Sequence, residues 1–245
     1  MDYKQIFYPE STFGGFTDID GTIAFYTRVN ALIEPSFVVL DVGCGRGSHD
    51  EDPITIRKGL RILKNKARTV IGVDVDKYAA QNPFLDKFYL LDDDPWPLND
   101  DSVDLIICDN VLEHVENPDK FFSEIYRISK DGCYLCIRTP NSWSYIAIIS
   151  WLIPNIYHAR ILAIVQNRKE EDVFPTYYRC NSISKIRAIL NKYQVEHIVY
   201  GYEAEPSYLS FSRFAYWLGV LHQRFAPSFL KPAIFTFGRV NKSRA

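Results

Sequence analysis

The chain has 245 residues, of which 47% are hydrophobic, and a formal net charge of −2 at pH 7. A chain of this length and composition can bury a full hydrophobic core, as one domain with an appendage. The near-neutral charge and the lack of a long basic run give no electrostatic support for binding a nucleic acid backbone, so no nucleic acid partner is expected.

The first 37 residues are rich in aromatic side chains and predict an N-terminal cap with a helix near residues 22–33. These aromatics fit packing better than covering a ligand. The first five residues lack the charged-then-apolar layout of a secretory signal. The default expectation is therefore a cytoplasmic location.

An apolar run over residues 38–42 breaks into a glycine-rich turn. Gly43, Gly45 and Gly47 stand at alternate positions, which permits positive φ angles and lets the backbone come within contact distance of a small molecule. Asp41, near the end of the run, is placed to take a charged or hydroxylated part of that ligand. Taken alone, the pattern also fits a tight turn without a ligand or a nucleotide-binding loop of another kind.

Two further apolar runs end in acidic residues. The run at 69–73 ends at Asp74, and in a doubly wound sheet such an acid lies at the carboxyl end of the neighbouring strand, where it can accept both ribose hydroxyls. The run at 88–91 is followed by Asp92 and Asp93, either of which can accept from an adenine amino group. The three runs together predict a nucleoside-binding edge.

The order of these blocks resembles the class I S-adenosylmethionine-dependent methyltransferases, and within them the broad type 11 group. The similarity continues through residues 100–115, which resemble the family's fourth strand and the turn after it, and runs on to residue 141. The resemblance implies S-adenosylmethionine as the cofactor, with Asp109 among the residues that bind it. It also implies a Rossmann-like, doubly wound, mostly parallel seven-stranded sheet with helices on both faces, completed by strands at 195–202 and 233–240.

Two segments do not belong to that sheet and are expected to select the substrate. The predicted divisions are the N-terminal cap at 1–37, the cofactor-binding α/β core at 38–141, a substrate-side insertion at 142–181, and the completion of the sheet at 182–245 with an aromatic helical cover at 208–230. Neither the insertion nor the cover has the ~20 unbroken apolar residues of a membrane-spanning helix.

The insertion and the aromatic cover fit a hydrophobic lid over the active site better than a face resting on a membrane. The basic residues between 160 and 169 are balanced by the acidic residues 170–172, which weakens attraction to anionic lipid. Peripheral contact with the inner face of a membrane stays open, as does the oligomeric state.

A polar and aromatic block ends at Tyr177, Tyr178 and Arg179. It fits a salt-bridged surface loop as well as a site for an acceptor, in which the tyrosines face sugar rings and Arg179 pairs with a phosphate. Together with residues 138–143, the block resembles a bacterial methyltransferase subgroup associated with surface-polysaccharide biosynthesis. That resemblance implies a glycan acceptor.

Methylation of a hydroxyl requires a base to remove its proton. His114 is the candidate, because it follows the carboxyl end of the fourth strand and imidazole is the side-chain group best suited to accept a proton near neutral pH. It fits equally a histidine that bonds backbone at a helix start, and His158 is the reserve candidate. Residues 110–114 also resemble an E-x-x-E-H metal motif, but Asn110 replaces the first carboxylate, so no metal is expected.

The sequence is therefore interpreted as an S-adenosylmethionine-dependent methyltransferase that methylates an oxygen of a sugar or lipid-linked glycan intermediate. The first alternative is a C-methyltransferase acting on a quinone-like or other hydrophobic small molecule. The second is a non-catalytic, cofactor-binding partner. The sequence leaves the acceptor and the methylated atom open.

Overall fold

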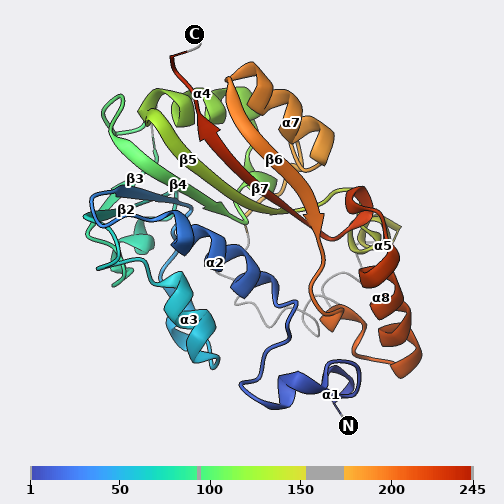
Figure 1. The fold of residues 1–245 in the computed structure, drawn as a ribbon. Helices are drawn as coiled ribbons and strands as arrows, with labels where there is room; N and C mark the ends of the chain where they lie inside the picture. The colour runs from blue at the N-terminus through green and yellow to red at the C-terminus, as the bar shows by residue number, and fades with distance from the viewer. Residues whose placement is uncertain (1, 93–94, 153–173, 244–245) are drawn as a thin grey trace.

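A computed structural model describes residues 2–92, 95–152 and 174–243. Its centre is a seven-stranded sheet in the order β3-β2-β1-β4-β5-β7-β6 (Figure 1). The first five strands are parallel, and β7 runs antiparallel to β5 and β6. The strands are β1 Val38–Val42, β2 Thr69–Asp74, β3 Lys87–Leu90, β4 Val103–Asp109, β5 Ser129–Pro140, β6 Val195–Tyr202 and β7 Ala233–Val240. The predicted fold is confirmed, including the bounds of its last two strands.

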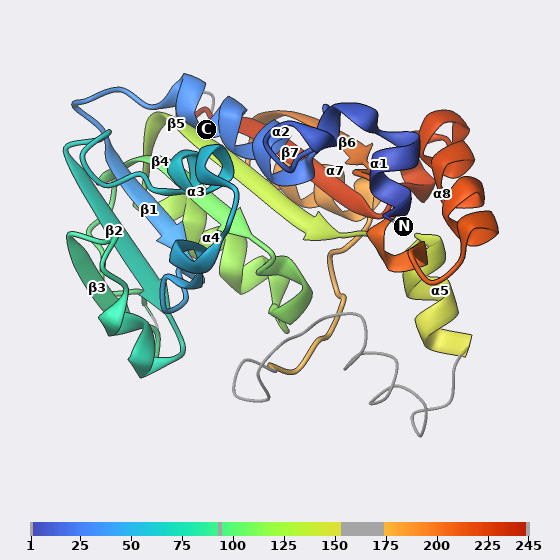
Figure 2. The same cartoon turned by 90° about the horizontal axis from the view of Figure 1, so that it is seen from below.

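Helices cover both faces of the sheet (Figures 1 and 2). They are α1 Tyr3–Phe7, α2 Gly21–Leu32, α3 Thr55–Arg61, α4 Pro118–Ile128, α5 Tyr145–Leu152, α7 Ile183–Lys192 and α8 Arg213–Phe225. Short 3₁₀ helices span Pro9–Thr12, Ser48–Glu51, Lys77–Gln81, Leu112–His114, Ser207–Leu209 and Ser228–Leu230. The helix predicted near residues 22–33 is α2.

The alternation of side chains along each strand builds two cores. Leu40 and Val42 of β1 point to the face covered by α4 and α7. Val39, which precedes Leu40, points to the opposite face and packs with α2. Cys133 and Cys136 of β5 likewise belong to opposite cores. The strands β1, β2 and β4 are buried on both sides, which is why their sequences are continuous apolar runs.

Capping side chains set where the helices begin. Asp20 accepts hydrogen bonds from the backbone N–H groups of Thr22 and Ile23 at the start of α2, both at 2.9 Å. Asn117 caps α4, where Pro118 occupies the first turn, and Ser182 caps α7. The first turn of α2 is thereby fixed at the carboxyl edge of the sheet, beside the site described below.

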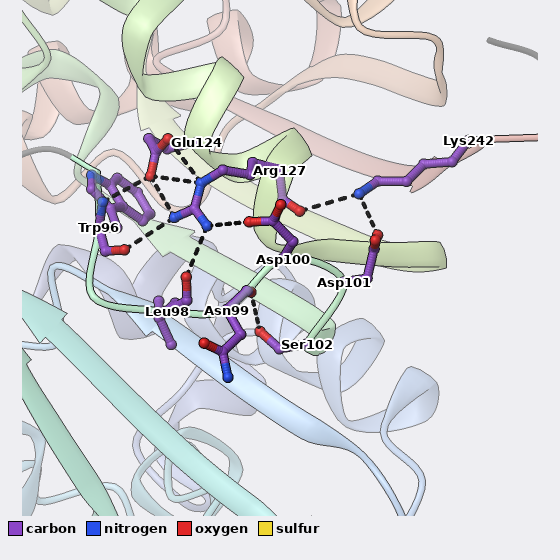
Figure 3. A network of polar contacts seen from close by, with 9 residues as sticks. All are labelled: Trp96, Leu98, Asn99, Asp100, Asp101, Ser102, Glu124, Arg127 and Lys242. Atoms are coloured by element: carbon purple, nitrogen blue, oxygen red, sulfur yellow. Dashed lines mark hydrogen bonds and ion pairs between the residues drawn. The ribbon is translucent and has the colours of Figure 1, made fainter.

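Arg127 of α4 holds the connection between β3 and β4 (Figure 3). Its guanidinium donates to both carboxylate oxygens of Glu124 and to the carbonyls of Trp96 and Leu98. It also donates to Asp100. The planar fork of an arginine suits this arrangement of several acceptors. The connection that follows the end of β3 is therefore tied to the covering helix on the far side from α2.

Candidate active site

The glycine turn after β1 has the backbone conformation that its sequence predicts. Gly43, Gly45 and Gly47 have φ angles of +67°, +56° and +81°. A Cβ on Gly43 would lie 2.6 Å from Cγ2 of Val111, so no larger residue fits there. A Cβ on Gly45 would meet no atom within 4 Å. The loop is thus packed at its first glycine and open at its second, where a ligand can approach the backbone.

Asp74 at the end of β2 clamps this loop. One carboxylate oxygen accepts from the backbone N–H of Gly45 and the other from that of Asp76, both at 2.9 Å. The side chain is buried beside the turn. Each oxygen keeps a second lone pair for a ligand hydroxyl. The role predicted for Asp74, acceptance of ribose hydroxyls, stays a prediction, and the structure adds a second role in holding the loop.

Asp41 is a carboxylate in need of a positive partner. Burial raises its pKa to about 7, and the nearby carboxylates of Asp109 and Asp74 add to the rise, although Arg61 opposes it. Among the described residues no side chain or N–H group donates a hydrogen bond to it. A cationic group of a ligand would stabilise its ionised form. This environment favours the charged over the hydroxylated ligand group among the two predicted for Asp41, and the contact itself stays a prediction.

We expect Asp41→Asn to stabilise the ligand-free protein at high pH. A raised carboxyl pKa means that the wild type loses stability as pH rises from the unfolded value of 3.8 through the folded value of about 7. Asparagine is neutral and of equal size, so the variant escapes this loss. The free energy of unfolding, measured by urea titration, should favour the variant by about 1–3 kcal/mol at pH 8 and by less at pH 5. Equal stability at both pH values would contradict the assignment.

Asp109 at the end of β4 lies in a buried ion pair. Arg138 donates to its two oxygens at 2.6 and 2.7 Å, and Tyr26 donates its hydroxyl at 3.0 Å. Burial by itself raises the pKa of Asp109, but the charge and hydrogen bonds of Arg138 outweigh it and the pKa is lowered. Asp109 is therefore ionised and orders the edge of the sheet. Its predicted contact with a cofactor stays a prediction.

Asp92, the first acid after β3, follows a residue that is hydrogen-bonded to Asp74. The backbone N–H of Leu91 donates to the Asp74 carbonyl at 2.8 Å, which brings the end of β3 beside the end of β2. Asp92 follows and is exposed. Asp93 lies outside the described residues. The predicted adenine-binding role of Asp92 therefore has a suitable place, and it stays a prediction.

His114 meets the polar and aromatic block predicted to bind the acceptor. Its Nδ1 lies 2.8 Å from the Pro175 carbonyl oxygen, and a carbonyl only accepts, so Nδ1 carries the proton. A neutral ring then has Nε2 free as a base. The N–H groups of Tyr177 and Tyr178 donate to the Glu113 carbonyl at 2.7 and 3.2 Å. The structure brings these predicted residues together, whereas His158 lies outside the described residues.

Beside this turn, Glu113 is buried and its Oε2 accepts from Thr139 at 3.1 Å. Burial raises the pKa of Glu113. In the described part of the chain there is no group of three or more His, Cys, Asp or Glu side chains that could hold a metal ion.

A cavity of about 470 Å³ lies at the same edge of the sheet. It is formed by the start of α2, the ends of β4 and β5, the start of α5 and the segment after β6. Its polar lining residues are Asp20, Thr22, Arg57, Asn110, Arg138, Asn141, Ser144, Tyr145, Tyr178, Tyr202, Glu203, Glu205, Ser207 and Tyr208. Of the three predicted acceptor-binding residues, Tyr178 lines the cavity, while Tyr177 and Arg179 are exposed outside its lining.

Both arginines of the cavity wall are paired with carboxylates. Arg57 donates to Asp52 at 2.5 and 2.8 Å and to Asp20 at 3.1 Å. Arg138 is paired with Asp109, as described above. The positive charges of the two wall arginines are therefore neutralised by their carboxylate partners.

Glu203 is a lining residue of this cavity and has one carboxylate oxygen without a hydrogen-bond partner among the described residues. The side chain is 4% exposed, and its Oε2 accepts from Nδ1 of His222 at 2.7 Å. Its Oε1 is buried and has no hydrogen-bond partner among the described residues. Burial raises the pKa of Glu203, although His222 opposes the rise. A buried carboxylate oxygen without a partner is costly, so this oxygen is suited to accept a hydrogen bond from a ligand.

Sequence reasoning missed Glu203 and Glu205, although a signal was present. Both acids follow the strand predicted at 195–202, in the same strand-then-acid pattern that identified Asp74. Because β6 has the same direction as β5, its carboxyl end lies at the same edge. The partner of Glu203, His222, comes from α8 and has no sequence signal of its own.

Comparison with known proteins identifies the family. Residues 22–175 match the family described as a methyltransferase domain (Methyltransf_23). The match covers more than half of the chain, and the protein belongs to this family. A Mycolicibacterium smegmatis protein named probable S-adenosylmethionine-dependent methyltransferase is 32% identical over 110 residues. That match covers 42% of this chain and 38% of the relative, so the chain spans well under two thirds of the relative's length.

Solved structures share the fold. A SAM-dependent methyltransferase from Archaeoglobus fulgidus is 18% identical, with a TM-score of 0.55, over 97% of this chain and 100% of that one. The geranyl diphosphate C-methyltransferase of Streptomyces coelicolor A3(2), solved with S-adenosyl-L-homocysteine, is 16% identical with a TM-score of 0.51, over 89% and 74%. These likenesses confirm the Rossmann-like methyltransferase fold.

Together the family and the relatives support an S-adenosylmethionine-dependent methyltransferase with S-adenosylmethionine as its cofactor. The type 11 group and the polysaccharide subgroup stay predictions. Within the described ranges, no helix is both long enough and apolar enough to cross a membrane.

Proposed function

We propose that the protein transfers the methyl group of S-adenosylmethionine to a hydroxyl of a sugar or lipid-linked glycan intermediate. The observation that carries the proposal is the open side of the glycine loop at Gly45. The loop follows Asp41 in the chain and its Gly45 N–H bonds Asp74, at the same edge of the sheet as a cavity of about 470 Å³. One edge thus offers places for both a cofactor and an acceptor.

The residues at this edge suit the cofactor. When bound, S-adenosylmethionine supplies an electrophilic methyl group on a positively charged sulfur. Asp41 would face its cationic amino-acid part, since that carboxylate lacks a hydrogen-bond donor. Asp74 would accept its ribose hydroxyls, and the exposed Asp92 its adenine amino group. The Gly45 loop, without a side chain in the way, would lie against the cofactor.

The cavity suits a hydroxyl-bearing acceptor. Tyr145, Tyr202 and Tyr208 line it with flat rings and hydroxyls, which are surfaces that pack well against sugar rings. The unpartnered oxygen of Glu203 would accept from an acceptor hydroxyl. Because Arg57 and Arg138 of the wall are already paired with carboxylates, a phosphate of a lipid-linked sugar would lie outside the cavity, where the exposed Arg179 can pair with it.

Calorimetry with S-adenosylhomocysteine tests the cofactor site most directly. Asp74→Ala should weaken binding by at least about tenfold, because it removes the clamp on Gly45 together with the ribose contact. Asp119→Ala, which removes an exposed carboxylate of α4 paired with Lys192, serves as the control and should bind as the wild type does. A folded wild type that binds neither S-adenosylmethionine nor its product would overturn the proposal.

We expect His114→Ala to lower methylation of a sugar hydroxyl by about 10²-fold or more, because it removes the base. C-methylation of an already acidic carbon would be spared. Initial rates with a panel of neutral sugars and lipid-linked sugars check this. Unchanged sugar methylation in the variant would remove His114 from the mechanism, and binding of the cofactor without turnover over the whole panel would favour the non-catalytic alternative.

A further inference from the structure

The outward side of α8 carries an apolar stripe that no described element covers. Phe214, Trp217, Leu218 and Phe225 recur at helical spacing and are 67%, 42%, 46% and 78% exposed. Phe211 precedes the helix and Phe229 follows it, and both are exposed. These six residues are called the α8 face. Figures 1 and 2 place α8 at the edge of the molecule, next to α1 and α5.

The opposite side of α8 already has its packing partners. Tyr216 and Val220 are buried and pack with Tyr8, Phe7 and Tyr3 of the N-terminal segment. The ring of Phe7 stacks on Tyr216 at 5.5 Å. The helix is therefore fixed to the domain by one side, and no described element covers its second apolar side, which is exposed.

The charged residues of the segment that carries the α8 face are all basic, although Glu203 from the segment after β6 pairs with His222 of α8. The chain from residue 206 to residue 245 has no Asp or Glu, although the whole protein has a net charge of −2. Arg213 and Arg224 stand exposed at the two ends of α8, and neither forms an ion pair with a described residue. A large aromatic face between unpaired arginines matches the composition of a helix that lies in the interface of an anionic membrane.

We propose that the α8 face rests on an anionic lipid surface, with α8 in the plane of the interface. Phe214, Trp217 and Phe225 would enter the boundary between headgroups and acyl chains, while Arg213 and Arg224 pair with lipid phosphates. The lipid occupant is favoured over a second copy of the chain, because a symmetric contact would bring the like-charged arginines of two copies together. Tyr208, three residues before Phe211, lines the cavity, so docking would hold the cavity near the lipid.

This proposal departs from the sequence-based preference for a lid over the active site. That preference depended on acidic residues in the insertion, which lie in a different part of the chain. Among residues 208–230, Tyr208 lines the cavity, whereas the six residues of the α8 face do not. Binding of the α8 face to lipid does not depend on methyl transfer, and it can be measured without an assay of enzyme activity.

Flotation of the full chain with vesicles tests the proposal. We expect the wild type to float with vesicles of phosphatidylcholine mixed with phosphatidylglycerol, and about tenfold less with phosphatidylcholine alone or in high salt. Phe214→Ser combined with Trp217→Ser should lower flotation by at least about tenfold. Arg213→Gln combined with Arg224→Gln should abolish the preference for phosphatidylglycerol.

Ile198→Ser is the matched control, because Ile198 is a 68% exposed apolar residue on β6. It should float as the wild type does, and thermal unfolding checks that every variant is folded. A wild type that does not float, or that floats equally well after Phe214→Ser and Trp217→Ser, overturns the proposal. So does a dimer, seen by light scattering, that these two substitutions dissociate, because the α8 face would then join two copies.

Discussion

Gly45→Ala is expected to weaken S-adenosylhomocysteine binding by about 100-fold while the protein stays folded. The φ angle of +56° makes an alanine there less stable by roughly 1–2 kcal/mol. Its Cβ would meet no protein atom within 4 Å and would instead occupy the open side of the loop, where the cofactor is proposed to lie. Calorimetry gives the affinity and thermal unfolding gives the stability.

Two other glycines separate the effect on binding from the effect on folding. Gly59 lies inside α3 with open space around its Cβ position, so Gly59→Ala should leave binding unchanged and raise stability by about 0.5–1 kcal/mol. Gly43→Ala should unfold the protein at a lower temperature, because its Cβ would lie 2.6 Å from Val111. Full affinity in Gly45→Ala would mean that the cofactor does not contact the open side of the loop.

Most of the sheet could be predicted because its signals are local. Each central strand is buried on both faces and so appears as a short apolar run, and acidic residues or glycines end the run where the chain turns. The bounds of β6 and β7 were predicted to the residue, because polar or proline residues adjoin both strands.

The site could be predicted only where it follows a strand. Asp41, Asp74 and the glycine turn were found in this way, but the clamp from Asp74 to Gly45 joins residues 29 positions apart and has no pattern in the sequence. The pairing of Asp109 with Arg138 is equally non-local. The sequence pattern predicts which residues follow strands. Which of these residues contact each other depends on tertiary packing, which the pattern does not contain.

The cavity illustrates the same limit on the acceptor side. Its walls come from α2, α5, β5 and the segment after β6, which are far apart in the sequence. Tyr177, Tyr178 and Arg179 were predicted to bind the acceptor because of their residue types. Only Tyr178 lines the cavity. Residue type suggested the chemistry of the site, and the topology of the sheet supplied its location.

Glu203→Gln is expected to lower kcat/KM for the acceptor by about 100-fold and to leave S-adenosylhomocysteine binding unchanged. Its Oε2 accepts from Nδ1 of His222, so the amide oxygen of a glutamine would take that position. The amide NH₂ would then replace Oε1 in the cavity wall, and an acceptor hydroxyl would meet a donor where it needs an acceptor. In enzymes that bind a substrate hydroxyl through a buried hydrogen bond, loss of that hydrogen bond lowers kcat/KM by several orders of magnitude.

The division of that loss between KM and kcat separates two roles for Glu203. If it binds the acceptor, Glu203→Gln raises KM and Glu203→Asp, which keeps the charge, recovers part of the loss. If it takes the proton, kcat falls in both variants, and the wild-type rate rises with pH through a pKa above the usual glutamate value, since burial raises the pKa of Glu203. A Glu203→Gln variant with unchanged kcat and KM would place the acceptor elsewhere, and the cavity would then have no part in methyl transfer.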